Sequence, residues 1–132
     1  MAVQSLKIPS CTNNLCKLEE FVQSIAKRYG ITEDKFPDIL ISLTEAVNNA
    51  IIHGNKKDIS KLVEIQMSRT DDGLAFTVRD EGAGFNPAKV PDPTTAERRH
   101  HCGGRGVFLM KQLADDIRFR NNGSTVEIHF AV

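Results

Sequence analysis

The sequence predicts an α+β fold: a two-layer α/β sandwich in which a mixed, mostly antiparallel sheet is covered on one face by helices. Two observations lead to this prediction. In the first half of the chain, apolar residues recur every three or four positions, the period of an amphipathic helix. In the second half, apolar and polar residues alternate in short runs joined by turn sequences, with one more helical pattern among them. Helices followed by an antiparallel meander favour two layers.

The composition fits one ordinary domain over residues 1–132. Hydrophobic residues make up 40% of the chain and charged residues 26%, which suits a globular core with a polar surface. Lys and Arg number 17, as do Asp and Glu, so charge gives no reason to expect nucleic acid or a membrane as partner. We expect neither a signal peptide nor a membrane helix. Three cysteines without framework spacing indicate a reduced, cytoplasmic protein.

The chain is predicted to begin with a short strand and a helix. Leu6 and Ile8 alternate with polar neighbours, and Pro9 ends the strand. Residues 12–14 offer side chains that can cap the following helix, which Gly30 closes. The inward face of this helix is expected to consist of Leu15, Leu18, Val22, Ile25 and Tyr29.

A second helix is predicted from the cap candidates Thr32 and Asp34 to Gly54, with Pro37 tolerated in its first turn. Gly54 is expected to adopt the left-handed conformation that ends many helices. The apolar side of this helix is formed by Phe36, Leu40, Leu43, Val47, Ala50 and Ile51.

A polar stripe lies on this second helix. Glu45, Asn49 and His53 are spaced four residues apart, and each step of four turns a side chain by only about 40°. Taken alone, such a stripe is more often the solvent-exposed side of an amphipathic helix. A carboxylate one turn from an amide, on a helix otherwise so apolar, also fits a lined cavity.

The second half of the chain reads as strands. Apolar residues alternate over 63–67 and over 74–78, and the Asp-Gly pair in 70–73 predicts a hairpin between them. The same alternation returns over 117–119 and over 126–130, on either side of an Asn-Asn-Gly turn. These four runs account for the antiparallel meander.

Residues 86–106 show no apolar period and contain three prolines and several glycines, so we predict a long loop. Loops of this length inside a compact domain are usually lids or binding loops. The loop ends at 103–106, where glycines open onto a helix whose apolar residues are Val107, Met110, Leu113 and Ala114. Free amides at a helix start favour a phosphate, and Arg105 can add a charge-assisted bond. A simple flexible hinge is the alternative.

Two further patterns leave alternatives open. Asp80 is followed by Gly82 and Gly84, which fits either a tight turn or a backbone that approaches a flat ligand while the carboxylate accepts a hydrogen bond. His100-His101-Cys102 could suggest zinc, but no second cysteine stands at ligand spacing. Adjacent histidines on a polar loop are therefore the preferred interpretation.

Three stretches, in this order, resemble the sequence boxes of the GHKL ATP-binding superfamily. The first contains Glu45, Asn49, His53 and Gly54, the second Asp80, Gly82, Gly84 and Phe85, and the third Gly104 and Gly106. The resemblance is closest to the small anti-sigma-factor serine/threonine kinases and covers nearly the whole chain. It implies the Bergerat ATP-binding fold, with residues about 86–106 as the ATP lid.

The resemblance implies a role for each matching position. Asn49 would bind Mg²⁺ and link it to the phosphates of ATP, Glu45 would be the general base, and Asp80 would bind the exocyclic amine of adenine. Gly82 would give the base room, and Gly84 would begin the lid. The remaining nucleotide-binding positions implied are His53, Gly103, Gly104, Arg105, Gly106 and Val107, of which Arg105 also counts as catalytic.

The function implied is that of an ATP- and Mg²⁺-dependent serine/threonine kinase that acts as an anti-sigma factor. Such a protein binds a sigma factor, phosphorylates a STAS-domain anti-anti-sigma factor and works as a homodimer. One alternative is a nucleotide-gated binding module without phosphotransfer. Another is the detached ATPase domain of a two-component histidine kinase, although residues 1–52 contain no histidine that could accept phosphate.

Overall fold

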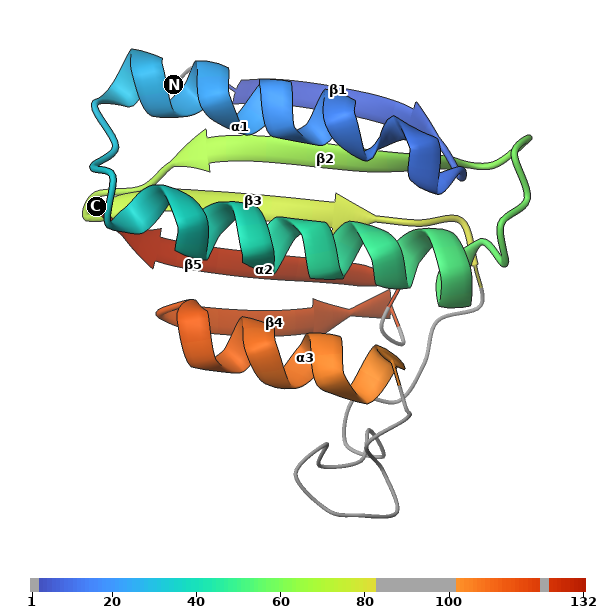
Figure 1. The fold of residues 1–132 in the computed structure, drawn as a ribbon. Coiled ribbons are helices and arrows are strands. Elements are labelled where there is room, and N and C mark those ends of the chain that lie inside the picture. The colour runs from blue at the N-terminus through green and yellow to red at the C-terminus, as the bar shows by residue number, and fades with distance from the viewer. Residues whose placement is uncertain (1–2, 83–101, 122–123) are drawn as a thin grey trace.

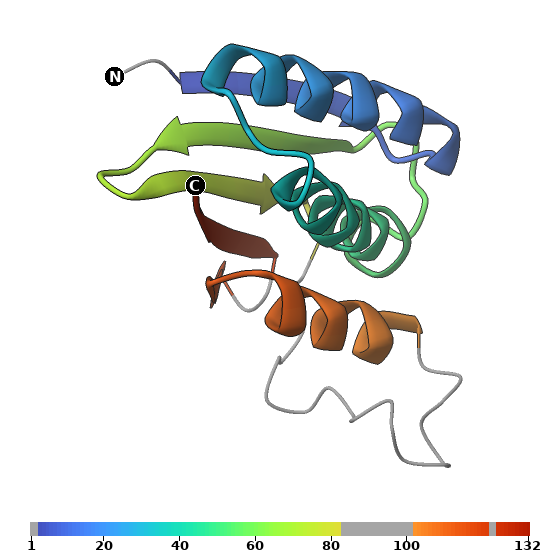
Figure 2. The ribbon, with the colours of Figure 1, turned by 60° about the vertical axis from the view of Figure 1, so that its left-hand side comes forward.

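The computed structural model describes residues 3–82, 102–121 and 124–132. Within these ranges, five antiparallel strands form one sheet in the order β1-β2-β3-β5-β4, and the helices lie on one face of it (Figures 1 and 2). The two-layer α+β architecture predicted from the sequence is therefore confirmed. The elements are β1 (Val3–Pro9), α1 (Leu15–Tyr29), α2 (Lys35–Asn49), β2 (Leu62–Arg69), β3 (Gly73–Arg79), α3 (Cys102–Leu113), β4 (Asp116–Arg120) and β5 (Thr125–Ala131).

The alternation in the strands separates the two faces of the sheet. Register pairs Met67 with Phe76 and Phe76 with Ile128, and all three side chains are fully buried under the helices. On the opposite face, Glu64 forms ion pairs with Lys7 and Arg79, at 3.9 and 3.8 Å. The period-2 pattern predicted these strands correctly because each of them has one buried and one polar face.

Helix α1 packs on the sheet as predicted. Leu18, Val22 and Ile25 are fully buried, and Gly30 ends the helix with φ of 65°, its N–H donating to the Ala26 carbonyl. The predicted side-chain caps do not form: neither Asn14 nor Asp34, the residues that precede α1 and α2, bonds a helix N–H through its side chain. For α2, the carbonyl of Thr32 accepts the N–H of Lys35 and of Phe36 instead.

The prediction for the end of the second helix is wrong in its detail. After Asn49 the chain continues as a π-helical turn, η2 (Ala50–Gly54), which closes with hydrogen bonds from the Asn55 N–H to the Ala50 carbonyl and from the Lys57 N–H to the Ile51 carbonyl. The left-handed residues are Lys56 and Lys57, with φ of 53° and 60°, whereas among the described glycines only Gly30 has a positive φ. Gly54 therefore has another role.

Replacing Lys57 by glycine is expected to stabilise the protein. A left-handed conformation costs a non-glycine residue roughly 1–2 kcal/mol, and the extra freedom of glycine in the unfolded chain offsets about 0.5–1 kcal/mol of that gain. We expect the free energy of unfolding to rise by about 0.5–1 kcal/mol, measured by denaturant unfolding. The matched control is Ile59→Gly, at an exposed position of the same loop without a positive φ, which should destabilise. Equal losses in both variants would refute this explanation.

Helix α3 begins one residue before the glycines at which the sequence pattern predicted its start. It starts at Cys102, so the glycines at 103, 104 and 106 belong to its first turns rather than to the end of the loop. Glycine is a poor helix former, and packing against α2, where Met110 is buried, overrides that preference. The rest of the predicted lid lies outside the described residues. None of the helices in the described part of the chain is long and apolar enough to cross a bilayer.

Candidate functional site

The end of α2 and the turn that follows β3 meet at one end of the sheet, on the right in Figure 1. The N–H of Asp80 donates to the Ser124 carbonyl at 2.9 Å, and the N–H of Gly82 donates to the Asp80 Oδ1 at 2.7 Å. Residues 80–82 thus form a tight turn, the Asp80 turn. The hydrogen bond from the Gly82 N–H fixes the orientation of the Asp80 carboxylate, as in other Asx turns.

Two glycines allow these segments to touch. A Cβ added to Gly54 would lie 2.4 Å from the Asp80 Cγ, and one added to Gly82 would lie 1.9 Å from the Gly54 carbonyl oxygen. Neither distance is compatible with a side chain. Gly82 is therefore required by a close approach to the Gly54 backbone, and Gly54, which stands 28 positions earlier in the sequence, leaves room for the Asp80 carboxylate. This contact joins the first two boxes of the sequence pattern.

Of the polar stripe formed by Glu45, Asn49 and His53, which runs from α2 into η2, Asn49 lines the recess that contains Asp80, and Glu45 and His53 are not among its lining residues. Glu45 and Asn49 are half-buried, whereas His53 is exposed. Asn49 faces the same small recess as Asp80, across the interface of α2 with the sheet. The recess is lined by Ala46, Asn49, Ala50, Val78, Asp80, Met110, Phe119, Ser124 and Val126. The structure therefore brings together the amide of Asn49 and the carboxylate of Asp80, which only the family resemblance had placed in one site.

Burial controls the chemistry of Asp80. Desolvation raises the pKa of its carboxyl, while the hydrogen bond from the Gly82 N–H and the charge of Lys61 act in the opposite direction. A carboxylate that keeps a raised pKa inside a recess is typical of a ligand-binding site. At neutral pH it is a strong hydrogen-bond acceptor, and its ionised form is the one that burial disfavours.

Replacing Asp80 by asparagine is expected to stabilise the free protein at neutral pH, because the amide oxygen still accepts the Gly82 N–H and the disfavoured charge is gone. A carboxyl with a raised folded-state pKa destabilises the fold above that pKa, and this penalty disappears below the pKa of the unfolded chain. The gain should therefore be largest near pH 7 and vanish in acid. Urea unfolding of both proteins across this pH range measures it. A gain that does not change with pH would argue against buried charge as the cause.

The phosphate side of the predicted site is described only in part. Gly84 lies outside the described residues. For 103–107 the structure gives the helical backbone of α3, so the roles proposed for Gly103, Gly104, Arg105, Gly106 and Val107 stay predictions. In the described ranges, no three His, Cys, Asp or Glu side chains gather as a metal-binding cluster. His100 and His101 lie outside these ranges, so the expectation against zinc also stays a prediction.

Sequence reasoning missed one buried polar residue at the site. Asn55 is 1% exposed, and its side-chain Oδ1 accepts the N–H of Glu81 at 2.8 Å. An asparagine after a helix end usually indicates only a turn, so the pattern gave no signal. Glu81 adds a second link, since its Oε2 accepts the Leu62 N–H at 2.6 Å.

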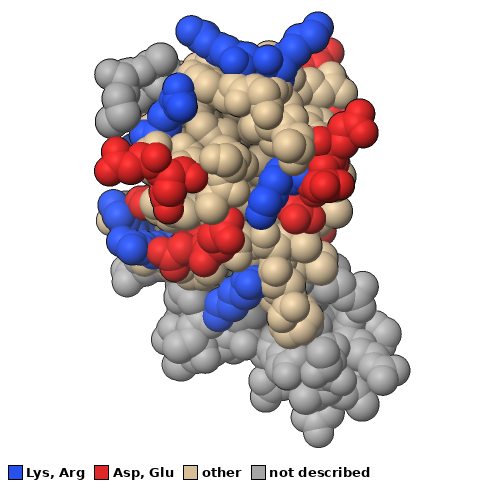
Figure 3. All heavy atoms as spheres, turned by 90° about the vertical axis from the view of Figure 1, so that its left-hand side faces the viewer, with Lys and Arg blue, Asp and Glu red and all other residues tan. Residues whose placement is uncertain are grey.

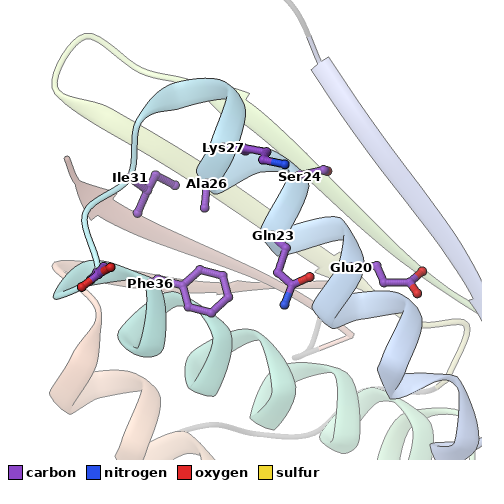
Figure 4. A pocket seen from close by; sticks show the side chains of 8 residues that line it. Glu20, Gln23, Ser24, Ala26, Lys27, Ile31 and Phe36 are labelled. Carbon is purple, nitrogen blue, oxygen red and sulfur yellow. The ribbon is translucent and has the colours of Figure 1, made fainter.

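Two other hollows lie away from the recess and contain none of the predicted site residues. An open groove of about 670 Å³ runs between α1 and the start of α2, and Figure 4 shows Gln23 and Phe36 pointing into it from the two helices. A hollow of about 190 Å³ lies between the α1–α2 connection and the β2–β3 turn. Figure 3 faces that end of the molecule and shows charges of both signs interspersed.

Comparison with known proteins identifies the family of this chain. Residues 8–130 match the family model of the histidine kinase-like ATPase domain. The chain is 31% identical over 128 residues to serine-protein kinase RsbW of Bacillus subtilis, covering 92% of this chain and 80% of that protein. It is 33% identical over 100 residues to anti-sigma F factor of Clostridium perfringens, covering 72% and 71%.

A solved structure supports the fold. The crystal structure of the RsbU and RsbW domains of Rv1364c from Mycobacterium tuberculosis superimposes with a TM-score of 0.68, at 15% sequence identity. The match covers 99% of this chain and 33% of that longer one.

Proposed function

Because the chain belongs to the histidine kinase-like ATPase family, and within it to the anti-sigma-factor kinases that include RsbW, we propose that it is a serine/threonine protein kinase that uses ATP. Its substrate is a serine or threonine of a STAS-domain anti-anti-sigma factor. The observation that carries the proposal is the shared recess of Asn49 and Asp80, together with the contact of Gly54 with Gly82 in the turn that carries Asp80.

The Asp80 turn offers the adenine end of ATP a hydrogen-bond acceptor beside a recess of about 20 Å³. Asp80 offers a half-buried acceptor, which matches the donor character of an exocyclic amine. On the side where a Cβ would stand, Gly82 faces the Gly54 backbone, so a glycine here lets the two segments approach and places the Asp80 carboxylate for the base. The exocyclic amine would hydrogen-bond to the Asp80 carboxylate, which the Gly82 N–H already orients.

The polar stripe fits the phosphate end. Asn49 presents an amide oxygen, a donor that suits Mg²⁺, and this ion would supply charge neutralisation at the phosphates. Glu45, one helical turn away, would accept the proton of the attacking hydroxyl. Arg105 and the first amides of α3 would stabilise the transferred group. Gly84 would begin the lid, and the glycines at 103, 104 and 106, with Val107 and His53, would lie near the phosphates.

The proposal extends to partners and cellular role. A serine-protein kinase and an anti-sigma F factor among the relatives support a protein that regulates transcription in the cytoplasm. In one state it binds a sigma factor, and in another it binds and phosphorylates the anti-anti-sigma factor. We propose that it does so as a homodimer.

Incubation with labelled ATP, Mg²⁺ and the cognate STAS-domain protein tests the proposal. Label is expected on one serine or threonine of the STAS protein and absent after that residue is replaced by alanine. Omitting Mg²⁺, or adding a chelator, should abolish labelling. If the protein binds ATP and its partner but transfers no label, the kinase assignment is wrong and the nucleotide-gated binding module is favoured.

A further inference from the structure

One buried amide connects four segments of the chain. The Asn55 Oδ1 accepts the Glu81 N–H at 2.8 Å, and its Nδ2 donates to the Ser10 Oγ at 2.8 Å and to the Leu62 carbonyl at 3.1 Å. The residue after β1, the residue after η2, the start of β2 and the turn after β3 are therefore joined by this side chain. These segments lie side by side at the right of Figure 1.

The orientation of the Asn55 amide is fixed by its partners. The Ser10 hydroxyl donates to the Lys61 carbonyl at 2.6 Å, so it accepts from the Asn55 Nδ2. The Leu62 carbonyl can only accept and the Glu81 N–H can only donate. Every polar atom of the amide is thus used, at a position 1% exposed, which makes the loss of any of these bonds costly.

The bond to Glu81 holds the backbone that follows Asp80 in the chain. Before this point, the N–H of Asp80 continues the β3–β5 ladder by donating to the Ser124 carbonyl. After Asp80 the chain has left the sheet, and the Glu81 N–H donates to the Asn55 side chain. The π-helical turn η2 places Asn55 beside Glu81, because the backbone N–H of Asn55 donates to the Ala50 carbonyl.

We propose that Asn55 is a positioning residue for base recognition: by holding the Glu81 N–H, it fixes the direction of the Asp80 carboxylate and so the preference for a base that carries an exocyclic amine. The inference rests on the proposed function. It predicts that loss of Asn55 weakens the contact between the protein and the amine of the base and leaves the contacts with the triphosphate intact.

Equilibrium binding of two nucleotides tests this prediction. The probes are ATP and purine riboside triphosphate, which has hydrogen in place of the amine. Asn55→Ala is expected to weaken ATP binding about tenfold and to change binding of the analogue less than about twofold. The preference of the wild-type protein for ATP should shrink accordingly. Equal weakening of both nucleotides would overturn the proposal, since a merely structural residue has no reason to distinguish them.

A matched variant removes a partner of the Asn55 Nδ2 and leaves the partner of the Oδ1 in place. Ser10→Ala removes the Ser10 hydroxyl but keeps the bond between Asn55 and Glu81. It should lower the melting temperature and leave the preference unchanged, and a lost preference in this variant would count against the proposal. If Asn55→Ala does not fold, Asn55→Ser, whose hydroxyl is too short to reach Glu81, replaces it. A wild-type protein that binds neither nucleotide would refute the proposed function instead.

Discussion

Replacing Gly82 by alanine is expected to abolish measurable ATP binding, with affinity falling by more than about 100-fold, or roughly 2.8 kcal/mol. The new Cβ would lie 1.9 Å from the Gly54 carbonyl oxygen and 2.8 Å from the Gly54 Cα. Both atoms belong to the backbone and cannot rotate away, so the Asp80 turn has to move off the end of α2. That movement separates Asp80 from Asn49 and opens the recess that the two side chains share.

The control for this prediction is Gly30→Ala, at the far end of α1. Gly30 has a positive φ of 65° and nothing within 4 Å of an added Cβ, so this variant should lose roughly 1–2 kcal/mol of stability and keep its affinity for ATP. Titration calorimetry on both folded proteins, with circular dichroism to confirm folding, separates the effects. If Gly82→Ala binds ATP within threefold of wild type, the close approach of the two segments is not required for the site.

Gly54 illustrates what the sequence can and cannot predict. Local rules assign a glycine after a helix to a left-handed cap, and they were right for Gly30. At Gly54 they were wrong, because the glycine is needed for the carboxylate of Asp80, a residue 26 positions away. A contact of this kind comes from tertiary packing, so neither periodicity nor propensity contains it. The three boxes nevertheless predicted that these stretches share a site.

Periodicity was reliable where one face is buried. Val63, Ile65 and Met67 alternate because β2 lies between a core and a polar face, and the prediction of these strands needed no tertiary information. The start of α3 at Cys102 could not be read in this way, since its first turns are rich in glycine and helix packing overrides propensity. Asn55 was missed for a related reason: its three partners come from three different segments.

Replacing Glu45 by glutamine is expected to reduce phosphotransfer by about 10²–10⁴-fold while ATP binding changes little. General-base catalysis contributes rate factors of this order, and the amide of glutamine cannot take up the proton of an attacking hydroxyl. Glutamine has the shape of glutamate and remains a good helix former, so the half-buried position on α2 should be preserved. Single-turnover labelling of the STAS-domain protein, with ATP affinity measured in parallel, gives both quantities.

The matched control is Asp38→Asn, which removes one negative charge from the same helix two turns before Glu45. It should transfer phosphate at the wild-type rate, because a charge effect at that distance is screened. If Glu45→Gln and Asp38→Asn behave alike, Glu45 is not the base. If the wild-type protein and Glu45→Gln both bind the partner only in the presence of ATP and neither transfers phosphate, the protein is a nucleotide-gated binding module. The proposed kinase mechanism uses the Glu45 carboxylate to remove a proton, whereas a module that only closes a lid on its partner has no use for that base.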